Sequence, residues 1–117
     1  MKVLNAPVRW LKSHWSDEDI WYFFEADEDG WVLRQVELHG REQTPACAAA
    51  LAEWPDAMTE GLEAVQKYES KYGAPSEKPI STWDADFPHE EISRAEFDEV
   101  WSRARAHLEL RGQHDDA

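Results

Sequence analysis

The 117-residue chain contains one cysteine, five glycines and no long run of apolar residues. The single cysteine, Cys47, cannot form a disulfide within the chain, which is typical of proteins in a reducing compartment. Residues 1–15 mix basic and apolar side chains and lack the unbroken apolar stretch of a signal peptide. No segment has the length and apolar character that a membrane span needs. We therefore expect a cytoplasmic protein with no membrane partner.

Recognisable catalytic and cofactor motifs are also missing. The sequence has no glycine-rich phosphate loop and no nucleophile elbow, and its five histidines lack the paired spacing of a zinc site. Residues 25–30 imitate the start of a calcium loop, but the twelfth position is Val36, where such a loop needs a bidentate carboxylate. A hairpin turn explains these acidic residues better, with a weak surface cation site as the alternative. We expect no metal, no cofactor and a non-catalytic protein.

Basic residues are scarce beside acidic ones. The chain has 25 Asp and Glu against 12 Lys and Arg, which gives a formal net charge of -13. Such a surface repels phosphate backbones, so direct nucleic-acid binding is not expected, whereas a basic protein partner is. Solubility alone is the simpler explanation of the charge. Seven tryptophans, however, exceed what one small core needs, and tryptophan is enriched where proteins bind partners.

The patterning predicts an α+β protein: an antiparallel sheet of three or four strands packed with two or three helices. We expect one domain over residues 1–111 and a frayed tail over 112–117. Residues 8–15 read as a first strand, and residues 20–26 and 31–38 as a hairpin around the turn of residues 27–30. Aromatic residues alternate onto both hairpin faces, so the hairpin is either packed between two layers or keeps one aromatic face for a partner.

The middle of the chain gives weaker signals than its C-terminal end. Residues 41–50 are expected to form a strand, with a helix start at Thr44 as the alternative, and short helices are expected over 51–60 and 61–72. A final helix over 94–108 is well specified, because Ser93 and Glu96 form a capping box and Ile92 and Phe97 a hydrophobic staple. Its apolar residues follow the spacing of one buried stripe: Phe97, Val100, Trp101, Ala104 and Leu108.

The loop before this helix is the first candidate binding surface. It places Trp83, Asp84, Asp86 and Glu90 close together in the sequence, and loops that carry aromatic and acidic side chains often bind partners. Packing of Trp83 against the sheet is the alternative. The second candidate is the hairpin end, with Trp31 and Asp29.

The hairpin with its acidic turn and residues 87–101, FPHEEISRAEFDEVW, resemble an uncharacterised family of small acidic, Trp-rich bacterial proteins, in particular its actinobacterial members. The resemblance implies a cytoplasmic bacterial protein and brings no catalytic residues. Proteins of this size and charge also include immunity proteins against secreted toxins, which is an analogy of class.

From these observations we predict a non-catalytic acidic module that binds a protein, in the form of a neutraliser of a basic toxin or nuclease. The alternative is a small-molecule-binding domain, or a weak enzyme, with an aromatic cleft. A purely structural or assembly role is a third hypothesis. A deep enclosed pocket lined by tryptophan would favour the alternative, and a flat acidic aromatic surface would favour the protein-binding module.

Overall fold

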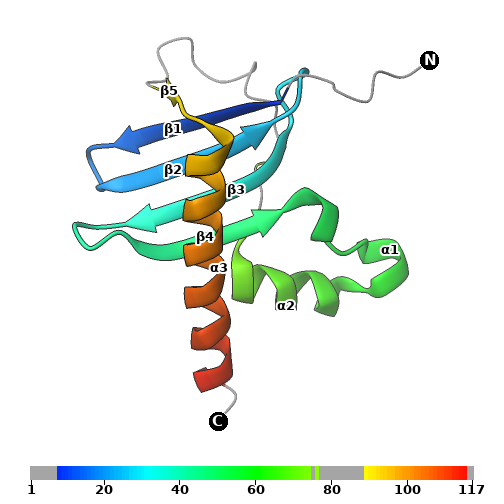
Figure 1. Cartoon of the computed structure of the whole chain (residues 1–117). Helices are drawn as coiled ribbons and strands as arrows, with labels where there is room; N and C mark the ends of the chain where they lie inside the picture. Colours follow the sequence, from blue (N-terminus) through cyan, green and yellow to red (C-terminus); the bar gives the residue numbers. More distant parts are fainter. Residues whose placement is uncertain (1–7, 75, 77–88, 116–117) are drawn as a thin grey trace.

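The computed structural model describes residues 8–74, 76 and 89–115 (Figure 1). Within these residues the chain is α+β, with a five-stranded antiparallel sheet in the order β4-β3-β2-β1-β5 and a long C-terminal helix across one sheet face. The strands are β1 (Arg9–Trp15), β2 (Ile20–Ala26), β3 (Val32–His39), β4 (Thr44–Ala50) and β5 (Glu90–Glu91). The helices are a 3-10 turn η1 (Leu51–Glu53), α1 (Ala57–Glu60), α2 (Leu62–Tyr72) and α3 (Arg94–Asp115).

The predicted strands β1, β2 and β3 form a continuous antiparallel meander. Phe23 lies opposite Val36, and a bulge after Glu25 places Ala26 opposite Val32. In the turn between β2 and β3, the Asp27 carboxylate accepts hydrogen bonds from the backbone N–H groups of Asp29 (3.0 Å) and Trp31 (2.9 Å). This side-chain-to-backbone bonding fixes the turn locally, which is why the hairpin could be predicted.

The sheet is wider than we predicted. Residues 44–50 form β4 and pair with β3, so the alternative of a helix start at Thr44 is wrong. The prediction of three or four strands also missed β5, which pairs with β1. The pairing continues just past β5, because the backbone N–H of Ile92 donates to the carbonyl of Trp10 at 2.8 Å. Two adjacent glutamates carry no strand signal, and only pairing with a distant strand makes this segment extended.

The prediction of one helix over 51–60 is wrong, because this segment forms two separate short helical pieces, η1 and α1. Helical structure ends after η1, at Trp54, and begins again at α1. There the Asp56 side chain accepts a hydrogen bond from the Met58 N–H at 2.9 Å. Pro55 explains the break, because a proline inside a helix removes a backbone donor and disfavours helical backbone before it. Helix α2 is confirmed, although none of its residues is fully buried and Leu62 is 64% exposed.

The start of α3 is confirmed, and its predicted end is not. Ser93 Oγ accepts a hydrogen bond from the Glu96 N–H at 3.1 Å, whereas the Glu96 carboxylate lies 3.4 Å from Lys12 Nζ. In this described segment, therefore, only the Ser93 half of the capping box forms. The helix then continues to Asp115, past both Leu108 and Gly112. One glycine inside a helix costs only about 1 kcal/mol, too little to end it.

The main core lies between α3 and the sheet. The predicted stripe of α3 packs on sheet residues of the same face, and the buried members of this cluster are Phe23, Val36, Leu38, Ala48, Phe97, Val100, Ala104 and Leu108. The other face of the sheet is buried as well, since Leu11 is 1% and Phe24 4% exposed. On that face the N–H of Ser76 donates to the Gln35 side chain at 3.0 Å. Both faces of the hairpin thus carry buried side chains, which favours the first alternative over an open aromatic face.

Candidate functional site

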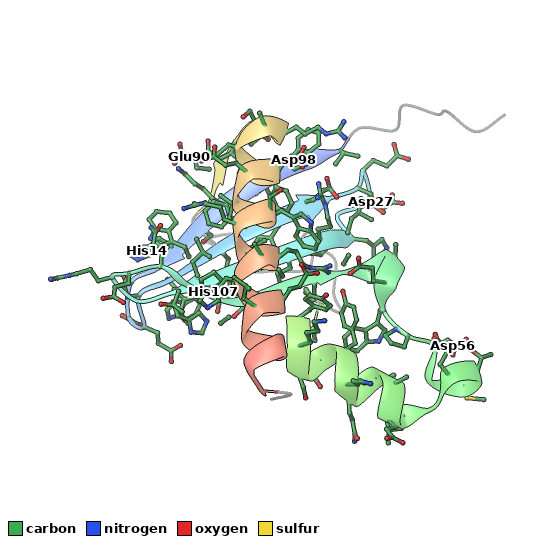
Figure 2. The ribbon with its side chains drawn as sticks, turned by 60° about the horizontal axis from the view of Figure 1, so that its bottom comes forward. His14, Asp27, Asp56, Glu90, Asp98 and His107 are labelled. Atoms are coloured by element: carbon green, nitrogen blue, oxygen red, sulfur yellow. The ribbon has the colours of Figure 1, made fainter. Side chains whose placement is uncertain are left out.

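The structure separates the predicted binding residues that it describes. Trp83, Asp84 and Asp86 lie outside the described residues. Glu90 is exposed on β5, and Trp31 is 44% exposed at the turn between β2 and β3. Because β1 and β2 lie between β5 and β3, Glu90 and Trp31 do not form one site. Figure 2 shows the same separation, with Glu90 and Asp27 on opposite sides of α3.

Two hollows flank α3 where it crosses the sheet. The first, which we call the Trp101 hollow, has a volume of about 550 Å³ and lies beside the β3–β4 end of the sheet. Its lining is largely apolar, with three charged side chains, and consists of Glu25, Leu33, Arg34, Ala50, Leu51, Ala52, Glu53 and Trp101. The hollow has apolar walls, and its charges are already paired within the chain: Glu25 with Arg34, and Glu53 with Arg105. That combination suits the side chain of a protein partner better than a reaction centre.

Arg34 occupies one wall of the Trp101 hollow. Its guanidinium donates to both oxygens of Glu25, at 2.8 and 2.7 Å, and to Asp98 at 2.9 Å. The Trp10 indole N–H also donates to Glu25, at 2.9 Å. Burial acts to raise the pKa of Glu25, but the hydrogen bonds from Arg34 and Trp10 and the charge of Arg34 outweigh it, so the pKa is lowered. Glu25 is therefore a fixed anion and a poor general acid.

A second arginine, Arg105, also lies against the Trp101 ring. Its guanidinium carbon lies 4.4 Å from the Trp101 ring centroid, and that of Arg34 lies 5.0 Å from it, so two cations contact one indole. Arg105 also pairs with Glu53 and donates to the Ala48 carbonyl at 2.8 Å. Hydrogen bonds from Arg105 and Tyr68 lower the pKa of Glu53, against the effect of burial.

The outer edge of β4 is covered by side chains. The Ala50 N–H donates to the Tyr68 hydroxyl at 3.0 Å, and the Arg105 side chain donates to the Ala48 carbonyl. Burial is the main reason that the pKa of Tyr68 is raised to about 12, so this hydroxyl stays protonated and neutral. A covered edge does not offer its backbone for strand addition by a partner. Partner binding through this part of β4 is thus disfavoured.

The turn between β2 and β3 presents Trp31 together with acidic residues. Glu28 and Asp29 are exposed, and neither forms an ion pair with any residue that the structure describes. Trp31 directly precedes β3, whose second residue, Leu33, lines the Trp101 hollow. We call Glu28, Asp29, Trp31, Leu33 and Leu51 the Trp31 surface. It combines exposed apolar groups with uncompensated negative charge.

Sequence reasoning missed a second exposed tryptophan of the same kind. Trp15 is 52% exposed and directly precedes the turn between β1 and β2, where Asp17 and Glu18 are exposed. Its signal in the sequence was the same as that of Trp31: a tryptophan beside an acidic turn. Next to it, His14 stacks on Trp21 with ring centroids 4.4 Å apart and pairs with Asp19 at 2.8 Å.

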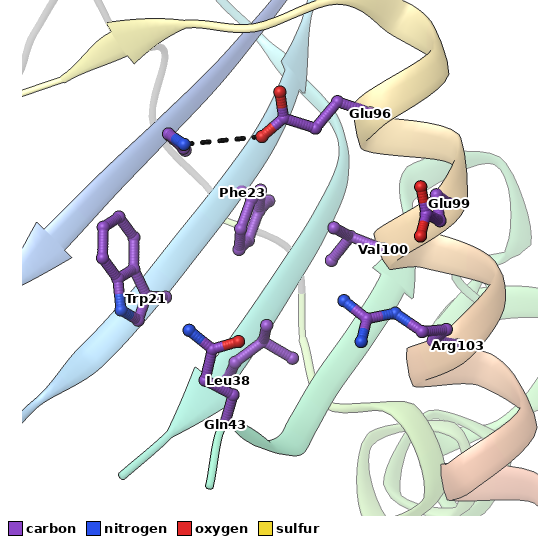
Figure 3. Close-up of a pocket in the computed structure, with 9 residues that line it drawn as sticks. Trp21, Phe23, Leu38, Gln43, Glu96, Glu99, Val100 and Arg103 are labelled. Atoms are coloured by element: carbon purple, nitrogen blue, oxygen red, sulfur yellow. Dashed lines mark hydrogen bonds and ion pairs between the residues drawn. The ribbon is translucent and has the colours of Figure 1, made fainter. Parts of the chain in front are cut away.

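The second hollow, which we call the Trp21 groove, lies on the opposite side of α3 (Figure 3). It has a volume of about 270 Å³ and an apolar floor, and charged and polar side chains stand around it. Its lining residues are Lys12, Trp21, Phe23, Leu38, Gln43, Glu96, Glu99, Val100 and Arg103. A smaller hollow of about 200 Å³ shares Leu38, Gln43, Val100 and Arg103 with it and continues towards His107. The groove is shallow and open, not the deep enclosed pocket of a typical small-molecule site.

Neither a metal-binding cluster nor a reactive thiol occurs among the described residues. No group of three or more His, Cys, Asp or Glu side chains among them could hold a metal ion. The thiol of Cys47 is buried, which raises its pKa to about 12 and leaves it unreactive at neutral pH. Within the same residues, no helix is long and apolar enough to cross a membrane.

Comparisons with known proteins do not assign the chain to a family. No family model matches the chain, and searches of curated proteins and of solved structures found no match either. The resemblance to acidic, Trp-rich bacterial proteins therefore stays a prediction.

Proposed function

We propose that this protein is a non-catalytic acidic module that binds a basic protein partner through the Trp31 surface. The observation that carries the proposal is the half-exposed indole of Trp31 beside Glu28 and Asp29, two carboxylates without a cation among the described residues. The partner class that fits best is a basic toxin or nuclease, which the module would neutralise by covering its basic groove. As part of the same proposal we place the protein in the bacterial cytoplasm.

The distribution of charge supports a basic partner. Four arginines of the described residues pair with carboxylates of the chain itself: Arg9, Arg34, Arg94 and Arg105. Their positive charge is neutralised locally, so these arginines do not offset the excess of acidic side chains behind the formal net charge of -13. A field of this sign raises the rate of encounter with a positively charged protein.

The apolar part of the Trp31 surface supports affinity. Tryptophan is the most frequent type of residue to dominate the binding energy of an interface, especially beside a hollow that a partner side chain can fill. Trp31 and the 45% exposed Leu51 offer such contacts, and Leu33 and Leu51 line the 550 Å³ Trp101 hollow. Glu25 and Arg34 inside that hollow already neutralise each other. A partner can therefore cover them without supplying a charge of its own.

Capture from a bacterial extract with the tagged chain, compared across variants, tests the proposal. Trp31→Ala should lose a basic protein that the unmodified chain enriches, and Trp15→Ala should keep it. The Trp15 variant is a matched control, because Trp15 is exposed to a similar degree beside an equally acidic turn. Retention by Trp31→Ala, with the fold intact, would contradict the proposed surface. Loss on Trp83→Ala alone would move the site to Trp83, Asp84, Asp86 and Glu90.

A further inference from the structure

The Trp21 groove holds two charged side chains that the proposed function does not use. Glu99 and Arg103 lie four positions apart on α3, at the spacing where a glutamate and an arginine commonly pair. Neither is in an ion pair with any described residue, although both line the groove. Figure 3 shows the Arg103 guanidinium reaching from α3 across the groove, towards the side of Leu38 and Gln43.

From this arrangement we infer that the Trp21 groove binds a free α-amino acid with an apolar side chain. The carboxylate of the ligand would pair with Arg103 and its ammonium group with Glu99. Neighbouring side chains on one helix face are about 5–6 Å apart at their Cβ atoms, so one zwitterionic head reaches both. The ligand side chain would lie on the floor formed by Trp21, Phe23 and Leu38.

The charge of the protein favours a zwitterion over a simple anion or cation. A chain with formal net charge -13 repels an anionic ligand, so Arg103 alone would attract one poorly. A purely cationic ligand would meet the positive charge of Arg103 inside the groove. A zwitterion has no net charge and satisfies both side chains at once.

Gln43 adds a neutral polar group on the opposite wall. It has a positive φ of 52°, a backbone conformation that is uncommon for a residue other than glycine, and its N–H donates to the Gly40 carbonyl at 3.0 Å. Figure 3 shows its side-chain amide within the groove, below Trp21. The amide can donate to a carboxylate or accept from an ammonium group. At one end of the groove, the ion pair of Lys12 with Glu96 leaves those two charges occupied.

The test is a titration of the isotope-labelled full chain with L-phenylalanine, followed by NMR through the Trp21 indole and Gln43 side-chain signals. An open groove and a ligand of this size predict a Kd on the order of 1 mM. Phenylalaninamide, which lacks the carboxylate, and N-acetylphenylalanine, which lacks the ammonium group, should each bind at least about tenfold more weakly. The inference does not rest on the proposed protein-binding function, so either can fail alone.

Variants localise the binding. Arg103→Gln and Glu99→Gln should each weaken phenylalanine binding about tenfold, and both residues are exposed, so the fold is kept. Arg41→Gln is the matched control, because Arg41 is also an exposed arginine without an ion pair among the described residues but does not line the groove. The inference is overturned by the absence of saturable shifts up to roughly 20 mM. Equal binding of phenylalanine and phenylalaninamide, or unchanged binding by Arg103→Gln, would overturn it as well.

Discussion

Replacing Arg34 with methionine should be among the most destabilising single changes in this protein. Methionine keeps much of the apolar volume against Phe97 and Trp101, so the loss comes mainly from charge. Glu25, whose side chain is only 15% exposed, would lose the two hydrogen bonds that Arg34 donates and the attraction of its positive charge. Breaking a buried ion pair by removing one partner costs 3–5 kcal/mol, and partial hydration puts the expected cost at about 3 kcal/mol.

The double variant Glu25→Gln, Arg34→Met separates the charge from the packing. It leaves no unpaired buried carboxylate, so we expect it to lose only about 1 kcal/mol relative to the unmodified protein. Urea unfolding followed by circular dichroism measures both values at neutral pH. A single variant that loses less than about 1 kcal/mol, or a double variant as unstable as the single one, would refute the reasoning.

The same pair predicts a dependence on pH. The folded pKa of Glu25 is lowered, so the pair stabilises the fold above the ordinary carboxylate pKa and loses this contribution as the pH falls through the folded pKa. The stability difference between the unmodified protein and the double variant should therefore shrink from about pH 5 downwards. A difference that stays constant to about pH 2 would contradict this.

Three further changes test the fold. Ser93→Ala should cost about 1 kcal/mol in urea unfolding, because it removes the side-chain acceptor for the Glu96 N–H; an unchanged midpoint would count against the cap. Trp101→Ala should cost about 3 kcal/mol, the lower end of the usual range, because its ring is packed on the core but only partly buried; Trp101→Phe should lose clearly less. A chelator should leave the melting temperature unchanged, because Asp27 binds its own turn and no metal-binding group was found among the described residues; a fall in melting temperature would reveal a metal site.

Local signals in the sequence predicted the elements that form from neighbouring residues. The turn at Asp27 and the cap at Ser93 are each made by hydrogen bonds across two to four positions, so the residue types alone indicate them. The buried stripe of α3 follows from helical spacing. In contrast, β5 depends on pairing with β1, whose residues lie about eighty positions earlier, and nothing local in Glu90 and Glu91 indicates it.

The candidate sites were harder to predict, because they depend on how distant segments pack. Trp101 fitted the α3 stripe, but its contacts with the guanidinium groups of both Arg34 and Arg105 depend on how the sheet and the helix pack together. The Trp21 groove likewise joins β1, β2, β3, the turn at Gln43 and α3. The charge and tryptophan content led to the prediction of a binding surface, with Trp31 among its residues. That the Trp31 side chain is exposed is known only from the structure.

The most direct test of the proposed function is the association rate with the captured basic partner, measured by stopped flow at low and high salt. If the acidic turn steers the encounter and Trp31 supplies affinity, the double variant Glu28→Gln, Asp29→Asn should bind several-fold more slowly at low salt with a nearly unchanged dissociation rate. Trp31→Ala should instead dissociate at least about tenfold faster. An association rate that is independent of salt and of both acidic residues, together with unchanged dissociation from Trp31→Ala, would contradict the account.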